Sequence, residues 1–321
     1  MTPLIRLAPD NPRFRFLRYR LPAFWASGAL ILLSLLLVVF GGLNFGIDFR
    51  GGILIEVRTA APADLARMRS ALGAADLGEV QLQEFGAPTD VLIRIERPQG
   101  DEQEQLAVVA EVRRVLAAEI GDGVSYRRVE FVGPKVSQEL LEAGVMAVVL
   151  SLVAILAYIW FRFEWQFGVG AIVALIHDVM LTLGVFAVID YEFNLATVAA
   201  LLTIVGYSLN DTVVIYDRVR ENLRRYKAKP LAELLDLSIN ETLARTIATG
   251  LTTLLALLAL FFFGGPVIQG FTFALIWGVI VGTYSTIYIA TPLLLYLNAR
   301  AEPVEATRPA AAARAERAGV P

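Results

Sequence analysis

Two ionisable residues within apolar segments could form an acid–base pair inside a membrane. Asp211 follows Asn210 in the apolar stretch 201–216. A carboxylate at membrane depth costs about 2.5–3.5 kcal/mol on insertion scales, so it rarely lacks a function or a partner. Arg245 opens the next apolar segment, and Thr249 follows it one turn later on the same helical face. An acid and a base on facing membrane helices are what a proton-driven machine needs.

The depths of Asp211 and Arg245 favour contact between them. At ~1.5 Å per residue, Asp211 lies roughly 24 Å from the outer end of its helix and Arg245 roughly 28 Å from the outer end of the next. The proton affinity of Asp211 would change as the guanidinium moves towards or away from it. Two alternatives remain open: Asn210-Asp211 could cap a shorter helix, and Arg245 could snorkel to the surface.

A second polar pair, His177-Asp178, lies near the centre of another apolar segment. Adjacent helical residues point in different directions, so the two side chains cannot face one partner equally. Either residue could extend a proton pathway to Asp211, together with Asn210 and Thr249. The alternative is a packed, hydrogen-bonded structural pair.

Composition places these residues in a membrane protein. The 321 residues are 56% hydrophobic and 18% charged, with a mean hydropathy of +0.61. The net charge of −3 does not favour a nucleic-acid partner. The absence of cysteine and the single histidine predict no metal site, and no nucleotide-binding or hydrolase motif is present. The chain is therefore predicted not to be an enzyme and to need no cofactor, with protons as the coupling ion.

Six apolar segments are long enough to cross a bilayer, which takes about 20 residues. They cover residues 23–42, 140–160, 167–189, 195–216, 243–263 and 268–297. The first is longer than a typical signal-peptide core and lacks a cleavage pattern, so we interpret it as a retained helix. Arginine and lysine gather before residue 22 and in the segment 217–242. The positive-inside rule then places both termini and the loop 217–242 in the cytoplasm, and residues 43–138 outside it.

Residues 43–138 alternate strand and helix signals in the order βαββαβ, which predicts a ferredoxin-like α+β domain. This fold serves many functions and predicts none by itself. In chain order, the expected organisation consists of a cytoplasmic tail (1–22), a transmembrane helix (23–42), the external domain (43–138), a five-helix membrane domain (139–298) and a disordered cytoplasmic tail (299–321).

Five motifs in this order resemble the SecF family of the SecD–SecF protein-export complex. They are residues 45–52 (FGIDFRGG), 132–137 (VGPKVS), 206–212 (GYSLNDT, continuing to 222), 240–246 (NETLART) and 263–266 (FGGP). The resemblance covers residues 20–297. It implies one six-helix half of a resistance-nodulation-division transporter, with the periplasmic domain inserted after the first helix and with SecD supplying the second half.

The resemblance also implies a function and its partners. Such subunits are integral to the bacterial inner membrane and use the proton-motive force to promote export of unfolded preproteins through the SecYEG translocon. Asp211 and Arg245 occupy the positions that the motifs assign to proton coupling, and the resemblance gives His177-Asp178 no definite role. The partners implied are SecD, SecYEG, preprotein and membrane lipid.

Two other functions fit the same architecture. A half-size proton-coupled exporter of small molecules or lipids would need a ligand-sized apolar cavity in the external domain. A scaffold without a coupling role would hold translocon subunits together and tolerate Asp211→Asn.

Overall fold

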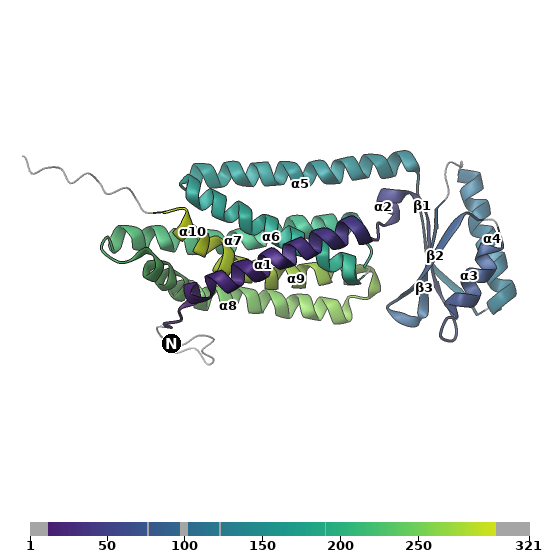
Figure 1. The fold of residues 1–321 in the computed structure, drawn as a ribbon. Coiled ribbons are helices and arrows are strands. Elements are labelled where there is room, and N and C mark those ends of the chain that lie inside the picture. The colour runs from purple at the N-terminus through teal and green to yellow at the C-terminus, as the bar shows by residue number, and fades with distance from the viewer. Residues whose placement is uncertain (1–11, 76, 97–101, 122, 190, 300–321) are drawn as a thin grey trace, which may run out of the picture.

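Long apolar stretches of the sequence form long helices. The computed structural model describes residues 12–75, 77–96, 102–121, 123–189 and 191–299. Within these ranges, six helices are long and apolar enough to cross a membrane. They form a bundle with a small sheet domain at one end (Figure 1). A membrane helical protein with an inserted ferredoxin-like domain is thus confirmed.

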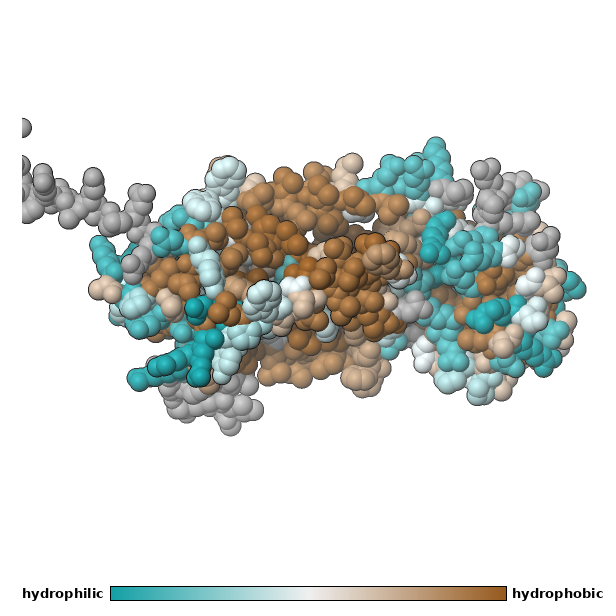
Figure 2. All heavy atoms as spheres, viewed as in Figure 1, coloured by the Kyte–Doolittle hydropathy of each residue, from teal (hydrophilic) through white to brown (hydrophobic). Residues whose placement is uncertain are grey.

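Several of the spans are composed of more than one helical element. The first contains η1 (Phe16–Tyr19), α1 (Arg20–Leu36) and η2 (Leu37–Gly41), and the next four are α5 (Pro134–Arg162), α6 (Trp165–Ile189), α7 (Leu195–Arg225) and α8 (Leu231–Phe263). The last contains α9 (Gln269–Ser285), η4 (Thr286–Ala290) and α10 (Thr291–Tyr296), after the short η3 (Pro266–Ile268). An apolar band covers the bundle, with polar residues gathered at both ends of the molecule (Figure 2).

The segment 217–242, predicted to be a cytoplasmic loop, is mostly helical in the structure, and its cytoplasmic location stays a prediction. Helix α7 continues to Arg225, and α8 begins at Leu231. Polar side chains do not by themselves end a helix, which continues as long as its backbone hydrogen bonds do. Arg218 stabilises the extension by an ion pair with Glu241 on α8, at 2.7 Å. Of the two predicted tails, residues 1–11 and 300–321 lie outside the described residues.

The inserted domain has the predicted βαββαβ order. Its elements are β1 (Gly52–Arg58), α3 (Leu65–Gly73), β2 (Glu79–Phe85), β3 (Ala87–Glu96), α4 (Glu102–Ile120) and β4 (Ser125–Val132). The four strands pair antiparallel in the order β2-β3-β1-β4. Alternate strand residues such as Ile55 and Ile93 pack against α3 and α4. The other face, with Leu54 and Leu92, lies towards the helix bundle (Figure 1).

The short segment between the first span and β1 connects the sheet domain to the bundle and also pairs with another part of the bundle. After the first span it forms α2 (Ile47–Arg50), and just before α2 it pairs with the turn between α6 and α7. The amide of Gly46 donates to the carbonyl of Phe193 at 3.0 Å, and the amide of Phe193 donates to the carbonyl of Asn44 at 2.7 Å. The rings of Phe45, Phe49 and Phe193 pack together there. The start of α7 is therefore held by the segment that leads into the sheet.

Glycines allow the membrane helices to approach closely. A Cβ at Gly278 of α9 would lie within 3 Å of Ile204 on α7, and one at Gly282 would lie 3.0 Å from the Cβ of Ser208. A Cβ at Gly184 of α6 would collide with Ser34 on α1. Small residues serve this purpose in membranes, where van der Waals packing drives helix association. The contact of α9 with α7 brings Ser208 into the polar interior described below.

Candidate functional site

Asp211 lies on the inner face of α7 with one oxygen satisfied and one free. The residue is only 9% exposed. Its Oδ1 accepts a hydrogen bond from the hydroxyl of Thr246 on α8, at 2.8 Å. Its Oδ2 is buried and has no hydrogen-bond partner among the described residues. A buried carboxylate oxygen without a donor is costly in apolar surroundings, and protonation relieves that cost.

Arg245 does not form the predicted contact with Asp211. Its side chain is exposed on α8 and makes no hydrogen bond or ion pair with any residue that the structure describes. Successive helical residues are rotated by about 100°, so Thr246 faces α7 while Arg245 points away. The two side chains are therefore not an ion pair in this structure, and the coupling role of Arg245 stays a prediction.

Thr246 is the site residue that sequence reasoning missed. Its signal was available, because Thr242, Thr246 and Gly250 recur every four residues and all three are buried. The predicted stripe on α8 begins at the exposed Arg245 and continues to Thr249, which is only half-buried. The hydroxyl of Thr249 forms no hydrogen bond within the described ranges. The buried stripe, and not the charged residue, identifies the face of α8 that meets α7.

Asn210 points away from the interior of this chain. Its side chain is exposed and has no hydrogen-bond partner in the part of the chain that the structure describes. Thr203 and Gly206 are exposed on the same face of α7, at positions i, i+3 and i+7 with Asn210. This exposed stripe of α7 is polar or small where lipid contact would favour apolar side chains.

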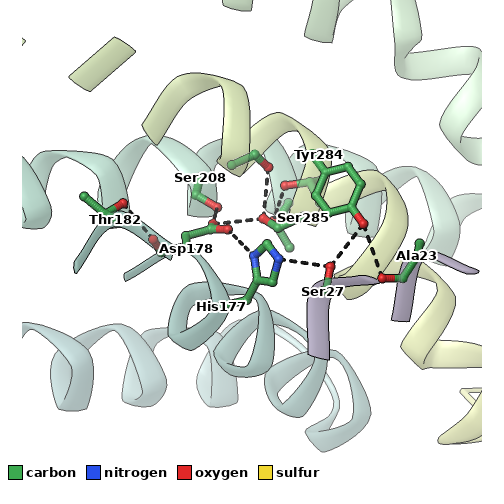
Figure 3. Close-up of polar contacts among 11 residues, drawn as sticks. Ala23, Ser27, His177, Asp178, Thr182, Ser208, Tyr284 and Ser285 are labelled. Atoms are coloured by element: carbon green, nitrogen blue, oxygen red, sulfur yellow. Dashed lines mark hydrogen bonds and ion pairs between the residues drawn. The ribbon is translucent and has the colours of Figure 1, made fainter. Parts of the chain in front are cut away.

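His177 and Asp178 form the centre of a buried polar network (Figure 3). Their side chains are 1% and 0% exposed, and His177 Nδ1 lies 2.9 Å from Asp178 Oδ1. The other oxygen of Asp178 accepts hydrogen bonds from the hydroxyls of Ser208 on α7, at 2.6 Å, and Ser285 on α9, at 2.9 Å. Both carboxylate oxygens of Asp178 are thus partnered, unlike those of Asp211.

The network extends from His177 to the first span. His177 Nε2 lies 3.2 Å from the hydroxyl of Ser27 on α1, which lies 3.0 Å from the hydroxyl of Tyr284 on α9. The Tyr284 ring stacks on the imidazole, with 5.9 Å between ring centroids. Four helices, α1, α6, α7 and α9, meet at this cluster. No hydrogen bond among the described residues connects it to the Asp211 carboxylate, which favours the structural interpretation of the pair.

Comparison with known proteins gives the family. Residues 113–300 match the family model of the protein export membrane protein SecD/SecF, C-terminal, and residues 36–63 match the SecD/SecF GG motif. The protein translocase subunit SecF of Rickettsia rickettsii is 47% identical over 295 residues, covering 92% of this chain and 95% of the relative. That of Magnetococcus marinus is 50% identical over 286 residues, covering 89% and 92%. The chain belongs to the SecF family.

This SecF-family chain is similar to part of two longer solved structures. The crystal structure of SecDF from Thermus thermophilus, a translocon-associated membrane protein, matches with a TM-score of 0.79 and 39% identity. The match covers 90% of this chain but only 39% of that one. A second SecDF structure, in a super-membrane-facing form, matches with a TM-score of 0.65 and 36% identity, covering 97% and 41%.

The glycines of the GG motif have a physical explanation in this fold. Gly51 and Gly52 both adopt positive φ, at 74° and 115°. A Cβ on Gly52 would lie 2.4 Å from the carbonyl oxygen of Ile95 in the neighbouring strand. The chain can therefore turn from α2 into β1 and pair with β3 only with glycine at these positions.

Proposed function

We propose that this chain is a proton-motive-force-coupled auxiliary subunit of the Sec translocon. With SecD, it would promote export of unfolded preproteins across the bacterial inner membrane, without enzymatic activity or a cofactor. Family membership supports the translocation role. The proton-coupling role depends on Asp211, whose unpartnered buried oxygen lies inside a membrane helix. Intramembrane carboxylates are functional by default because burying them is expensive.

In the proposed cycle, Asp211 takes up a proton at Oδ2 while Thr246 keeps Oδ1 oriented. Each proton that crosses a potential of 100 mV releases about 2.3 kcal/mol. Arg245 would change the proton affinity of Asp211 by moving towards or away from it, because a nearby cation favours the charged form of a carboxylate. Its exposed position leaves it free to make that movement.

SecD is the proposed partner in the membrane. The SecDF structure is much longer than this chain, which leaves room for a second set of helices. The exposed stripe of α7, with Asn210 and Gly206, would pack against that partner, because an amide facing lipid without a hydrogen bond costs free energy. SecYEG and preprotein follow from the family role, and lipid would surround the apolar band of the bundle.

The proposed orientation places both termini in the cytoplasm and the sheet domain, within 43–138, in the periplasm. Arginines support it, because the C-terminal part of α7 carries Arg218, Arg220, Arg224 and Arg225. That end of α7 lies away from the sheet domain (Figure 1). The His177-Asp178 network is proposed to hold α1, α6, α7 and α9 in register around the coupling helix. It would contribute to proton movement only if water bridged it to Asp211.

A small-molecule exporter receives less support. It needs a largely apolar ligand cavity, usually of about 300–1,000 Å³. A cavity beside α3 in the sheet domain measures about 240 Å³. A cavity of about 340 Å³ on the other side of the sheet is lined by polar side chains that include Arg50, Gln81 and Arg94.

The test uses vesicles that contain this chain, SecD and the translocon, with preprotein export followed with and without a proton gradient. Asp211→Asn should abolish the gradient-dependent part of export while leaving assembly intact. Asp217→Asn is the matched control, because Asp217 lies on the same helix but forms an exposed ion pair with Arg162 at 2.8 Å. If Asp211→Asn vesicles respond fully to the gradient, the scaffold function replaces the coupling function.

A further inference from the structure

One buried arginine of the sheet domain contacts three other segments of the chain. Arg94 lies on β3, on the sheet face that lies towards the bundle, and its side chain is 4% exposed. Its Nη1 donates to Asn44 Oδ1 at 3.0 Å and to Gln81 Oε1 at 3.3 Å. Its Nη2 lies 3.1 Å from Oε2 of Glu192, in the turn between α6 and α7. The guanidinium therefore joins the sheet to the segment after the first span and to the turn before α7.

Glu192 occupies a position that only glycine at residue 46 leaves open. A Cβ on Gly46 would lie 2.3 Å from Glu192 Oε1. The backbone of Gly46, with φ −70° and ψ 171°, suits any residue, so the close approach and not the conformation requires glycine. An alanine there would displace the carboxylate from Arg94 without straining its own backbone.

The first turn of α7 is tied to the same place. The backbone amide of Leu195 donates to Asp48 Oδ2 at 2.8 Å. The hydroxyl of Thr197 donates to the carbonyl of Glu192 at 3.2 Å, within the capping box that Asn194 begins. Glu192 is therefore linked through its backbone carbonyl to the N-terminal cap of α7.

Arg94 is the cation that directly offsets the negative charge of Glu192. Asp48 acts on Glu192 as a second acid, and Arg94 and Arg128 are the facing cations. Burial raises the pKa of Glu192, and Arg94 opposes that rise. Without Arg94, two acidic groups would lie close together with only Arg128 to offset them.

We propose that Arg94 is a positioning residue that couples the periplasmic sheet to the first turn of α7 through Glu192. Helix α7 is continuous from Leu195 to Arg225 and carries Asp211, so a shift of the sheet and a shift of Asp211 would accompany each other. We call the contacts from Arg94 through Glu192 to the first turn of α7 the joint, and its existence is argued from these contacts alone. The link from the joint to proton use at Asp211 rests on the proposed function. Such a joint is how protonation within the membrane could move the sheet domain.

The joint is tested by a distance measurement that needs no export activity. The chain has no cysteine, so spin labels can be attached at Ser125→Cys on β4 and Phe263→Cys at the outer end of α8. Both positions are exposed. The labelled chain, assembled with SecD in vesicles, gives a distance distribution between the sheet domain and the bundle. Arg94→Gln and Gly46→Ala should each broaden or shift that distribution.

Two further variants test whether a change in the distance distribution comes from the Arg94–Glu192 pair. Adding Glu192→Gln to Arg94→Gln should restore most of the narrow distribution, because it removes the acid that the arginine neutralised. Arg67→Gln is the matched control, since Arg67 forms an exposed ion pair with Glu119 inside the sheet domain, at 3.1 Å. An unchanged distribution in Arg94→Gln, or failure of Glu192→Gln to restore it, would overturn the joint.

Export measurements then test whether the joint links the sheet domain to proton use at Asp211. Arg94→Gln should lower gradient-dependent export about five-fold or more, the lower end of coupling between linked sites, with partial recovery in the double variant. Asp211→Asn should lose the gradient response and keep the narrow distribution. If Asp211→Asn exports normally, the proposed function fails while the distances still decide the joint. If Arg94→Gln broadens the distances but exports normally, the sheet is not coupled to proton use.

Discussion

At the scale of single residues, two buried aspartates differ in their hydrogen bonds, and this difference is why we propose a structural role for Asp178 and proton exchange for Asp211. Asp178 has donors for both oxygens, whereas Asp211 has a donor for only one among the residues that the structure describes. A fully satisfied buried carboxylate holds helices together, and an incompletely satisfied one can exchange a proton at moderate cost. This contrast could not be derived from the sequence, because both residues are aspartates near the middle of apolar segments.

Thr246→Val tests the role of the hydroxyl that orients Asp211. Valine keeps the shape and removes the donor, and a hydrogen bond to a charged group contributes about 1.5–3 kcal/mol. We expect gradient-dependent export to fall by roughly ten-fold or more, since 1.4 kcal/mol corresponds to a factor of ten. Thr252→Val is the control, because the exposed Thr252 hydroxyl bonds only to carbonyls of its own helix. Equal export by both variants would remove Thr246 from the site.

The pKa of Glu192 predicts a pH dependence with a definite sign. Burial raises this pKa above its ordinary value of 4.5, so the folded chain holds the proton more tightly than the unfolded chain. The stabilisation is complete below 4.5 and is lost as pH rises through the folded-state pKa. Asp90 does not interfere, because its hydrogen bond with Arg58 lowers its pKa below 3.8.

Glu192→Gln should therefore remove one pH-dependent contribution to stability. In detergent, the unfolding temperature of the variant relative to wild type should rise between about pH 4.5 and neutral pH, as the wild-type carboxyl ionises. Glu119→Gln, which alters an exposed ion pair, serves as the control. A difference that stays constant or falls with pH would contradict the assigned direction.

At the scale of elements, close helix packing depends on particular glycines. Gly184→Ala would place a Cβ 2.9 Å from the Cα of Ser34, so α1 and α6 must separate. Overpacking of this kind costs about 1–3 kcal/mol. We expect a lower unfolding temperature in detergent. Gly28→Ala on α1 is the matched control, since a Cβ there meets no atom of another described segment within 4 Å. Equal stability of the two variants would show that α1 is not packed against α6.

Helices and strands could be predicted from the sequence where the pattern of apolar residues defines them. The strands and helices of the sheet domain were predictable because Ile53–Val57 is a short run rich in β-branched and apolar residues, and because apolar residues recur at helical spacing in 102–120. The end of α7 was not, because hydropathy reports where the membrane ends and not where the helix ends. The depth of Asp211 could be estimated from the rise per residue, but the rotation that places Thr246 and not Arg245 beside it depends on tertiary packing.

At the scale of the whole molecule, the exposed stripe of α7 indicates an incomplete bundle. Asn210 has no partner among the described residues, and Thr203 and Gly206 share its face. A lone amide in the hydrocarbon region would be left unsatisfied, whereas a packed neighbouring helix could supply a hydrogen bond and use Gly206 for close approach. The extra length of the SecDF structures provides a source for that helix. The stripe is thus a better candidate for the SecD contact than the apolar surface of α1.

Gly206→Leu should consequently weaken SecD pairing without unfolding the chain. Apart from the backbone of its own helix and its chain neighbours, no atom of the described residues lies within 4 Å of a Cβ built at Gly206, so leucine fits the isolated bundle. At a close helix contact the same side chain would cost about 1–3 kcal/mol, and 1.4 kcal/mol lowers the association constant ten-fold. Gly28→Leu, equally open but on α1, should retain SecD. Co-purification of SecD in mild detergent, normalised to the amount of this chain, distinguishes them. Equal recovery with both variants would place the SecD contact on another face, and the unpaired Asn210 would then need a different partner.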